Sequence, residues 1–285
     1  MMHTAITVGV DGSRTARSAL AWAAEDAERR GLPLRIVHVS EPWPSEHPLG
    51  ASSDGKTLTE QCEMLLADAA ERARTHAPRA RISTVLLAGS VIERLKTESE
   101  TADTVVVGSR GLGGFSGLVL GSVGLSLAGY VKCPLVVVRT LPHGGSGEVV
   151  VGYDGSPCAD MAMEYALAQA AVRHVRLRVL YGRRYPVMAP HPAGYGPLPV
   201  DETPEIGQRL IAWREKYPHI ELIESIVSEH PVPALAKASR AAELVVVGSR
   251  GLGGFTGLML GSVSHGVLHR AHCPVAVVNA PECRS

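Results

Sequence analysis

The chain has 285 residues, of which 45% are hydrophobic and 20% are charged, a composition typical of a globular protein with a filled core. Lys and Arg number 28, as do Asp and Glu, so nothing in the composition favours nucleic acid or an anionic membrane as a partner. With no apolar run near ~20 residues, no recognisable secretory signal and five scattered cysteines, we expect free thiols and a cytoplasmic location.

The first half of the chain alternates short β-branched runs with amphipathic segments. Strands are predicted at 6–10, 34–39, 82–87, 104–107 and 135–138. Helices are predicted from a Ser13 cap to Gly31, over 56–77, from a Ser90 cap to about 99, and over 122–131. Such alternation predicts a parallel sheet with right-handed crossovers and helices on both faces.

The second half repeats the first. VVVGSRGLGGFSGLVLGSV at 105–123 returns as VVVGSRGLGGFTGLMLGSV at 245–263, and VGVDGS from Val8 returns as VGYDGS from Val151. We therefore expect an α/β protein of two tandem, doubly wound, five-stranded parallel-sheet domains, at 1–141 and 148–285, joined by a linker at 142–147. Long loops are expected at 41–56 and 185–204, either as lids or as disordered segments.

A glycine motif occupies the end of the fourth strand in each half. The motif is Gly-x-x-Gly, nine residues, then Gly-Ser, and its members are Gly108, Gly111, Gly121 and Ser122 in the first half and Gly248, Gly251, Gly261 and Ser262 in the second. Backbone amides without side chains can approach a phosphate closely, and the start of the following helix favours an anion. The Ser122 hydroxyl either caps that helix or donates to phosphate. Arg110 and Arg250 either reach a phosphate or pair with an acid at the domain seam.

Asp11 and Asp154 follow the first strand of each half and should face the glycine loop. Each carboxylate would lie against the base or ribose of a nucleotide, or on a metal ion that bridges to its phosphates. Capping of the first helix by the same carboxylate is the structural alternative.

Other motifs carry less weight. Residues 50–57 match a Walker A loop letter for letter, but no strand precedes them directly and the second half has no counterpart, so we interpret the match as chance. His265 and His269 are spaced like metal ligands without the accompanying glutamate, and we expect helix-surface or core histidines there. No nucleophile–base pair recurs in both halves, so we assign no catalytic residue and no metal ligand.

The combined motifs resemble the universal stress protein family in its tandem two-domain form. That resemblance implies a Rossmann-like fold related to adenine nucleotide alpha hydrolases, a pseudo-dimer in which 135–138 pairs with 275–278, and ATP as ligand, with Mg²⁺ as an optional companion. It places a residue at the end of the second strand beside the adenosine, Val39 in the first half and Gly182 in the second. With the loop arginines, the predicted first ATP site comprises Asp11, Val39, Gly108, Arg110, Gly111, Gly121, Ser122 and Val123. The predicted second site comprises Asp154, Gly182, Gly248, Arg250, Gly251, Gly261, Ser262 and Val263.

From these residues we expect an ATP-binding regulatory protein of the stress response, with the nucleotide as a bound ligand that shifts conformation. Adenine nucleotide and a second copy of the chain are the expected partners. A slow ATP hydrolase or an adenylyl-transferring enzyme is the alternative, and an interaction module that no longer binds nucleotide is a third hypothesis.

Overall fold

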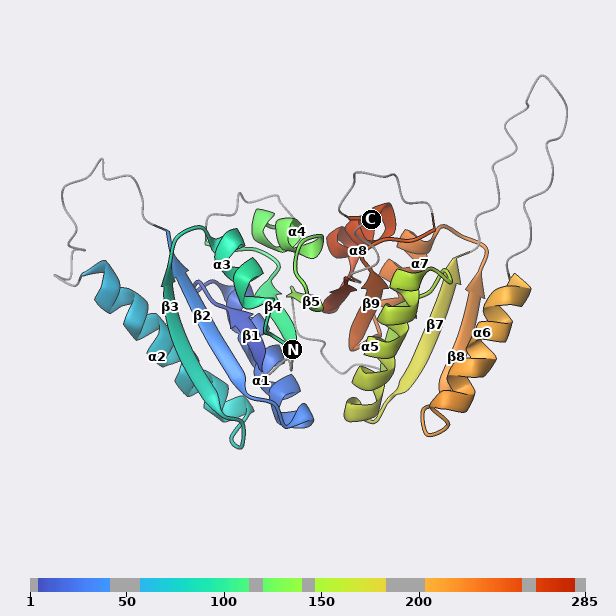
Figure 1. Ribbon diagram of the computed structural model, residues 1–285, viewed down its shortest axis with the longest axis horizontal. Coiled ribbons are helices and arrows are strands. Elements are labelled where there is room, and N and C mark those ends of the chain that lie inside the picture. Colours follow the sequence, from blue (N-terminus) through green and yellow to red (C-terminus); the bar gives the residue numbers. More distant parts are fainter. Residues whose placement is uncertain are drawn as a thin grey trace, which may run out of the picture.

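The computed structural model describes residues 5–41, 57–112, 120–139, 147–182, 203–252 and 260–279, which form two halves of the same architecture (Figure 1). The first half contains β1 (Ile6–Gly9), α1 (Arg14–Arg30), β2 (Leu34–Ser40), α2 (Leu58–His76), β3 (Ile82–Ala88), α3 (Val91–Glu98), β4 (Thr104–Gly108), α4 (Ser122–Ala128) and β5 (Leu135–Val138). The second contains β6 (Glu148–Gly152), α5 (Pro157–Arg173), β7 (Arg176–Gly182), α6 (Thr203–Lys216), β8 (Leu222–Val227), α7 (Pro231–Ala238), β9 (Leu244–Gly248), α8 (Ser262–Arg270) and β10 (Val275–Val278).

The strands form one ten-stranded sheet in the order β3-β2-β1-β4-β5-β10-β9-β6-β7-β8. Within each half every pairing is parallel, which confirms the predicted α/β fold with crossover helices. The two halves meet at β5 and β10, which pair antiparallel with Ala276 opposite Val136. Both central strands are thereby paired on both sides, so neither is an open apolar edge.

Helices cover both faces of the sheet, and a separate hydrophobic core lies under each face. Along β4, Val106 belongs to the core beneath α1, α2, α5 and α6, whereas Val105 and Val107 belong to the core beneath α3, α4, α7 and α8. All three side chains are buried, as expected for a parallel strand that is covered on both faces. This burial explains why β4 reads as an unbroken apolar run.

Most helix ends follow the predicted signals, and three differ. Ser13 caps α1 as expected, since its hydroxyl oxygen accepts from the Ala16 amide at 3.1 Å. Ser90 makes no side-chain cap, and the Val91 amide donates instead to Glu41 Oε1 at 3.1 Å. The predicted helix over 122–131 stops at Ala128, because glycine is a poor helix former and Gly129 follows there. The loop expected at 185–204 ends two residues early, where α6 begins; residues 42–56, 140–146 and 183–202 lie outside the described residues.

A buried ionic cluster joins α1 of the first half to α5 of the second. Asp26 is fully buried, and its carboxylate accepts from Arg173 at 3.1 Å and from Gln169 at 3.3 Å. Arg30 lies 3.5 Å away on the same helix, and the Arg173 guanidinium lies 5.2 Å from the centre of the Trp22 ring. Trp22 is therefore an interface residue, and the seam depends on a carboxylate that is costly to bury without its partners.

The cysteines only partly follow the expectation of free thiols. Cys62, Cys133 and Cys273 are free and buried, and burial raises the pKa of Cys133 and of Cys273 to about 12, so neither is a reactive thiolate at neutral pH. Cys158 is disulfide-bonded, so the prediction is wrong there, because spacing along the chain does not reveal proximity in space. No described helix is long and apolar enough to cross a membrane.

Candidate functional site

The loops that follow β1 and β4 meet through one carboxylate. Asp11 Oδ1 accepts from the Ser13 amide at 2.9 Å, across a turn in which Gly12 has a φ of 84°. Asp11 Oδ2 accepts from the Leu112 amide at 3.0 Å, so the carboxylate faces the glycine loop and ties it to the start of α1. Since Ser13 provides the helix cap, the alternative in which Asp11 caps α1 is wrong.

We call these two hydrogen bonds of the aspartate the clasp, and the second half contains the same clasp. Asp154 Oδ1 accepts from the Ser156 amide at 3.1 Å, and Asp154 Oδ2 accepts from the Leu252 amide at 3.0 Å. Two independent copies with the same contacts indicate that the clasp is a property of the motif and not of one local environment.

Two of the glycines are required because other atoms occupy the place of a side chain. A Cβ on Gly111 would lie 2.7 Å from Asp11 Oδ2, and a Cβ on Gly251 would collide with Asp154 Oδ2 in the same way. Gly108 has a different role, because its Cβ would lie 2.7 Å from the backbone carbon of Thr15 in the first turn of α1. Gly248 is likewise closed in by the backbone of Cys158, at 2.8 Å from its oxygen. Gly108 and Gly248 therefore bring the helix and the strand together, a role that we had not assigned to them.

Thr15 is a site residue that the sequence analysis missed. Its Oγ1 donates to the Arg110 carbonyl and accepts from the Arg110 amide at 3.3 Å, so one hydroxyl binds both backbone polar groups of Arg110. The sequence held no signal for it, because Thr15 lies outside every repeated motif. Its counterpart in the second half is Cys158, which has no hydroxyl, so this contact is not repeated there in the same form.

Of the backbone amides in the glycine loop and at the start of the following helix, some already donate hydrogen bonds within the protein and others do not. The Gly121 amide donates to the Ser109 carbonyl at 2.7 Å, and the Gly261 amide donates to the Ser249 carbonyl at 2.7 Å, so both amides have a partner within the protein. Within the described ranges the other amides donate no hydrogen bond, namely those of Gly111, Ser122 and Val123 and of Gly251, Ser262 and Val263. Neither α4 nor α8 has a side-chain cap, which excludes the capping role for the Ser122 hydroxyl.

The loop arginines bring positive charge to these amides. Arg110 is exposed and Arg250 is half-buried, and neither forms an ion pair with any acid in the described part of the chain. Arg110 also lies close enough to Arg139, beyond β5, that burial and then the Arg110 charge lower the pKa of the Arg139 guanidinium. The pairing with an acid at the seam is therefore not seen among the described residues.

The residues expected at the adenosine end differ between the halves. Val39 is half-buried in β2 and packs against the core beneath α3 and α4. Gly182 ends β7, and a Cβ there would lie 2.8 Å from the Cα of Pro231. Glycine is needed at this position because α7 begins so close to the end of β7, which the sequence did not indicate.

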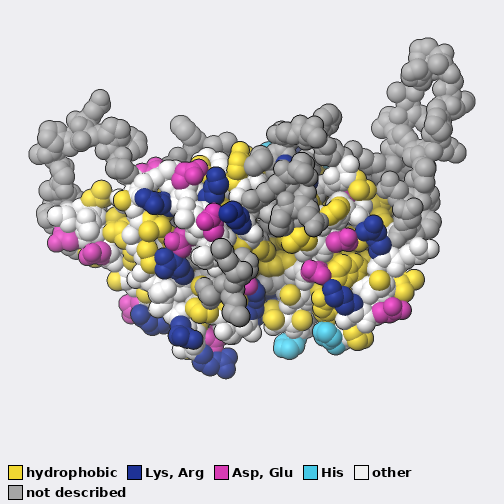
Figure 2. Space-filling model, viewed as in Figure 1, with side chains coloured by type: hydrophobic (Ala, Val, Ile, Leu, Met, Phe, Trp, Pro, Cys, Tyr) yellow, Lys and Arg dark blue, Asp and Glu magenta, His cyan; other side chains and the backbone are white. Residues whose placement is uncertain are grey.

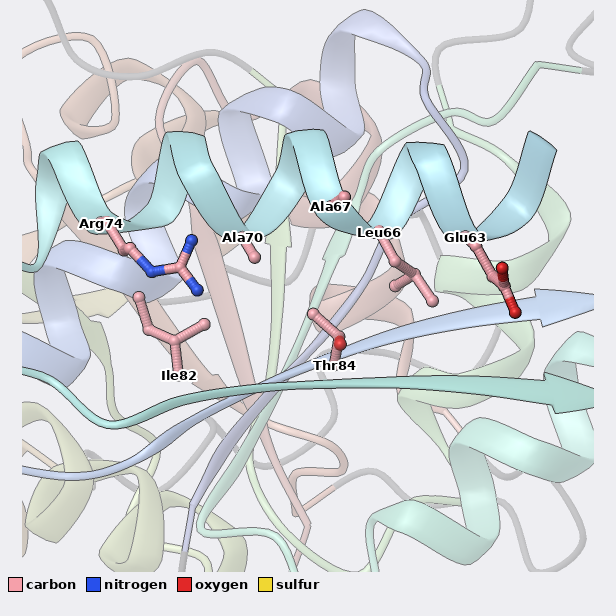
Figure 3. A pocket seen from close by; sticks show the side chains of 7 residues that line it. All are labelled: Glu63, Leu66, Ala67, Ala70, Arg74, Ile82 and Thr84. Carbon is pink, nitrogen blue, oxygen red and sulfur yellow. The ribbon is translucent and has the colours of Figure 1, made fainter. Parts of the chain in front are cut away.

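A hollow elsewhere on the molecule is separate from this site. It measures about 350 Å³ and lies between α2 and the edge strand β3, lined by Glu63, Leu66, Ala67, Ala70, Arg74, Ile82 and Thr84 (Figure 3). None of these residues belongs to the predicted site, and β2 lies between this edge strand and β1 in the sheet (Figure 1). Figure 2 shows acidic and basic side chains interspersed over the face in view, in keeping with the balanced composition.

The Walker A match and the histidine pair can also be located in the structure. Thr57, the last residue of the Walker A match, caps α2: its hydroxyl oxygen accepts from the Glu60 amide at 3.2 Å, and residues 50–56 lie outside the described part. The His265 and His269 rings lie 4.6 Å apart on α8, and the described ranges contain no group of three or more potential metal ligands.

Comparison with known proteins gives a consistent result over the whole chain. The profile of the universal stress protein family matches twice, over residues 2–139 and 146–279. Two universal stress proteins of Mycobacterium tuberculosis are each 32% identical to this chain, over 302 residues (97% of the chain and 95% of the relative) and over 286 residues (95% and 96%). The crystal structure of a universal stress protein from Archaeoglobus fulgidus shares the fold, with a TM-score of 0.72 and 23% identity over 98% of this chain and 97% of that one.

Proposed function

Because the chain belongs to the universal stress protein family, we propose that it binds ATP as a regulatory ligand at two sites, one in each half. The observation that carries this proposal is the repeated clasp, in which Asp11 and Asp154 hold a loop of open backbone amides beside an uncapped helix start. Anions are favoured by such amides and by the positive end of a helix dipole, so this arrangement suits a polyphosphate.

Each site divides into a phosphate end and an adenosine end. In the first, the amides of Gly111, Ser122 and Val123 would donate to phosphate oxygens, with the Ser122 hydroxyl and Arg110 as further donors. Gly251, Ser262, Val263 and Arg250 would do the same in the second site. The four glycines Gly108, Gly121, Gly248 and Gly261 would shape the two loops, since their own contacts are within the protein.

At the adenosine end, Asp11 and Asp154 keep acceptor capacity for a ribose hydroxyl, because a carboxylate has about four lone-pair sites and each of these uses two. Val39 would offer an apolar contact to the base, and Gly182 only its backbone. Magnesium would enter with the nucleotide and be held mainly by phosphate oxygens, since this ion is usually bound through substrate phosphates and water.

The biological setting follows from the family and is part of the same proposal. We place the protein in the cytoplasm as a stress-response regulator, with domains at 1–141 and 148–285 joined by residues 142–147, and with a second copy of the chain as partner. ATP would act by favouring one conformation, which requires that it bind one state more tightly than the other.

Thermal unfolding in the presence of nucleotide tests the proposal. At about 100 times its dissociation constant, ATP should stabilise the fold by about 2.7 kcal/mol for each site that it fills. A melting temperature that does not change at millimolar ATP, with and without magnesium, contradicts binding. ATP turnover above roughly one per minute that is lost on Asp11→Ala together with Asp154→Ala would favour the slow hydrolase over the regulatory ligand.

A further inference from the structure

The two helices at the mouths of the proposed sites, α4 and α8, are equivalent by repeat but are not held equally. We infer that α8 is fixed before nucleotide binds, whereas α4 is ordered by the nucleotide, so that the first site is the one that changes conformation. The inference rests on the proposed function only in its second part, because the anchoring of each helix exists without ligand.

The first difference lies at the start of the helices. Ser264 is 1% exposed, and its hydroxyl lies 3.0 Å from the Ser249 carbonyl oxygen and 3.1 Å from the Gly261 carbonyl oxygen, so it ties the first turn of α8 to the loop after β9. The same position in α4 is Gly124, which has no side chain to make this bond. The nearest atoms to a Cβ on Gly124 would be methyl carbons of Leu120 and Val137 at 3.6–3.7 Å, an ordinary contact. Glycine is therefore not required there by space, and it weakens the helix.

The second difference lies at the end of the helices. Arg139, which follows β5, donates to the Leu268 and His269 carbonyl oxygens at 3.1 Å each, and so places a cation at the C-terminal turn of α8. The counterpart of Arg139 in the second half is Asn279, and among the described residues its buried Nδ2 has no hydrogen-bond partner. The last turn of α4 therefore lacks the contact that its twin receives from across the seam.

Both differences leave α4 less firmly held than α8. The nine-residue α8 is held at its first turn by its own half and at its last turn by the other half, whereas the seven-residue α4 has neither anchor. Ordering a loose element takes free energy from binding, so nucleotide at the first site would be coupled to a conformational change that the second site has already completed.

Hydrogen–deuterium exchange on the full chain tests this, with the helical amides of α4 and α8 followed separately. Without nucleotide we expect α4 to exchange at least tenfold faster than α8, and saturating ATP should slow exchange in α4 by the larger factor. Equal exchange in the two ligand-free helices, or a larger ATP effect in α8, would overturn the inference.

Three substitutions separate the hydroxyl anchor from helix propensity, because alanine is a better helix former than serine. Gly124→Ser should slow ligand-free exchange in α4 more than Gly124→Ala does, and Ser264→Ala should speed exchange in α8 at least twofold although propensity alone predicts slower exchange. If Gly124→Ser slows exchange less than Gly124→Ala does, or if Ser264→Ala slows exchange in α8, the serine hydroxyl does not anchor the helix. If ATP protects neither helix, the proposed function fails, while the ligand-free comparison still decides whether α4 and α8 are anchored differently.

Discussion

Replacing Gly111 by alanine should weaken the first nucleotide site while leaving the fold intact. The new Cβ would lie 2.7 Å from Asp11 Oδ2, so the carboxylate must move and lose the 3.0 Å bond from the Leu112 amide. That bond lies near the surface, where a hydrogen bond contributes about 1 kcal/mol. We therefore expect the free energy of unfolding to fall by about 1 kcal/mol and ATP affinity at the first site to fall at least fivefold.

Isothermal titration calorimetry with ATP can resolve this effect against two matched variants. Gly251→Ala should weaken the second site instead of the first, because its Cβ collides with Asp154. Gly207→Ala changes a glycine in α6 that has no atom within 4 Å of the new Cβ, so both sites should keep their affinity. Unchanged dissociation constants at both sites in Gly111→Ala would refute the role of the clasp.

Three further substitutions probe the frame around the sites. Gly108→Ala places a Cβ 2.7 Å from backbone atoms in the first turn of α1, which cannot rotate away, so chemical denaturation should show a loss of about 2–3 kcal/mol; a loss below 0.5 kcal/mol would mean that the helix yields. Asp26→Ala leaves the buried Arg173 with only the Glu243 carboxylate at 3.8 Å and should cost about 3 kcal/mol in the same assay, whereas a neutral result would show that the seam does not need the pair. Burial, and then the neighbouring His265 and Arg139, lower the pKa of His269, so the folded state binds fewer protons than the unfolded state just below the unfolded pKa near 6.5. Stability should therefore fall as pH drops from 7.5 to 5.5, and His269→Gln should flatten part of that slope in melting curves; an unchanged slope would exclude this histidine as a contributor.

Much of the fold was readable because burial imposes a pattern on the chain. A strand covered on both faces must be apolar throughout, as β4 is, and helices that pack on one face carry apolar residues at helical spacing. Caps were less readable, since the amide at the start of α3 is bonded by Glu41 from a distant segment instead of by the adjacent Ser90. The disulfide bond of Cys158 was also not predicted, because the spacing of cysteines along the chain does not show which of them are close in space.

The approach of the loops around the proposed site was predicted in outline, but the contacts of individual atoms were not. The repeat and the motif brought Asp11 and the glycine loop together correctly, because both follow adjacent parallel strands. The sequence did not show that Gly108 accommodates the backbone of α1, or that the Gly121 amide is already bonded to Ser109, since each depends on the exact approach of two elements. Thr15 was missed because a single hydroxyl outside the repeat carries no periodic signal.

The most direct measurement is a crystal structure of the full chain grown with ATP. The account predicts phosphate oxygens within about 2.7–3.2 Å of the amide nitrogens of Gly111, Ser122 and Val123, with the matching contacts in the second half. Nucleotide in the groove between α2 and β3, or vacant loops at saturating ATP, would contradict the claim that open amides beside the aspartate clasp hold the polyphosphate.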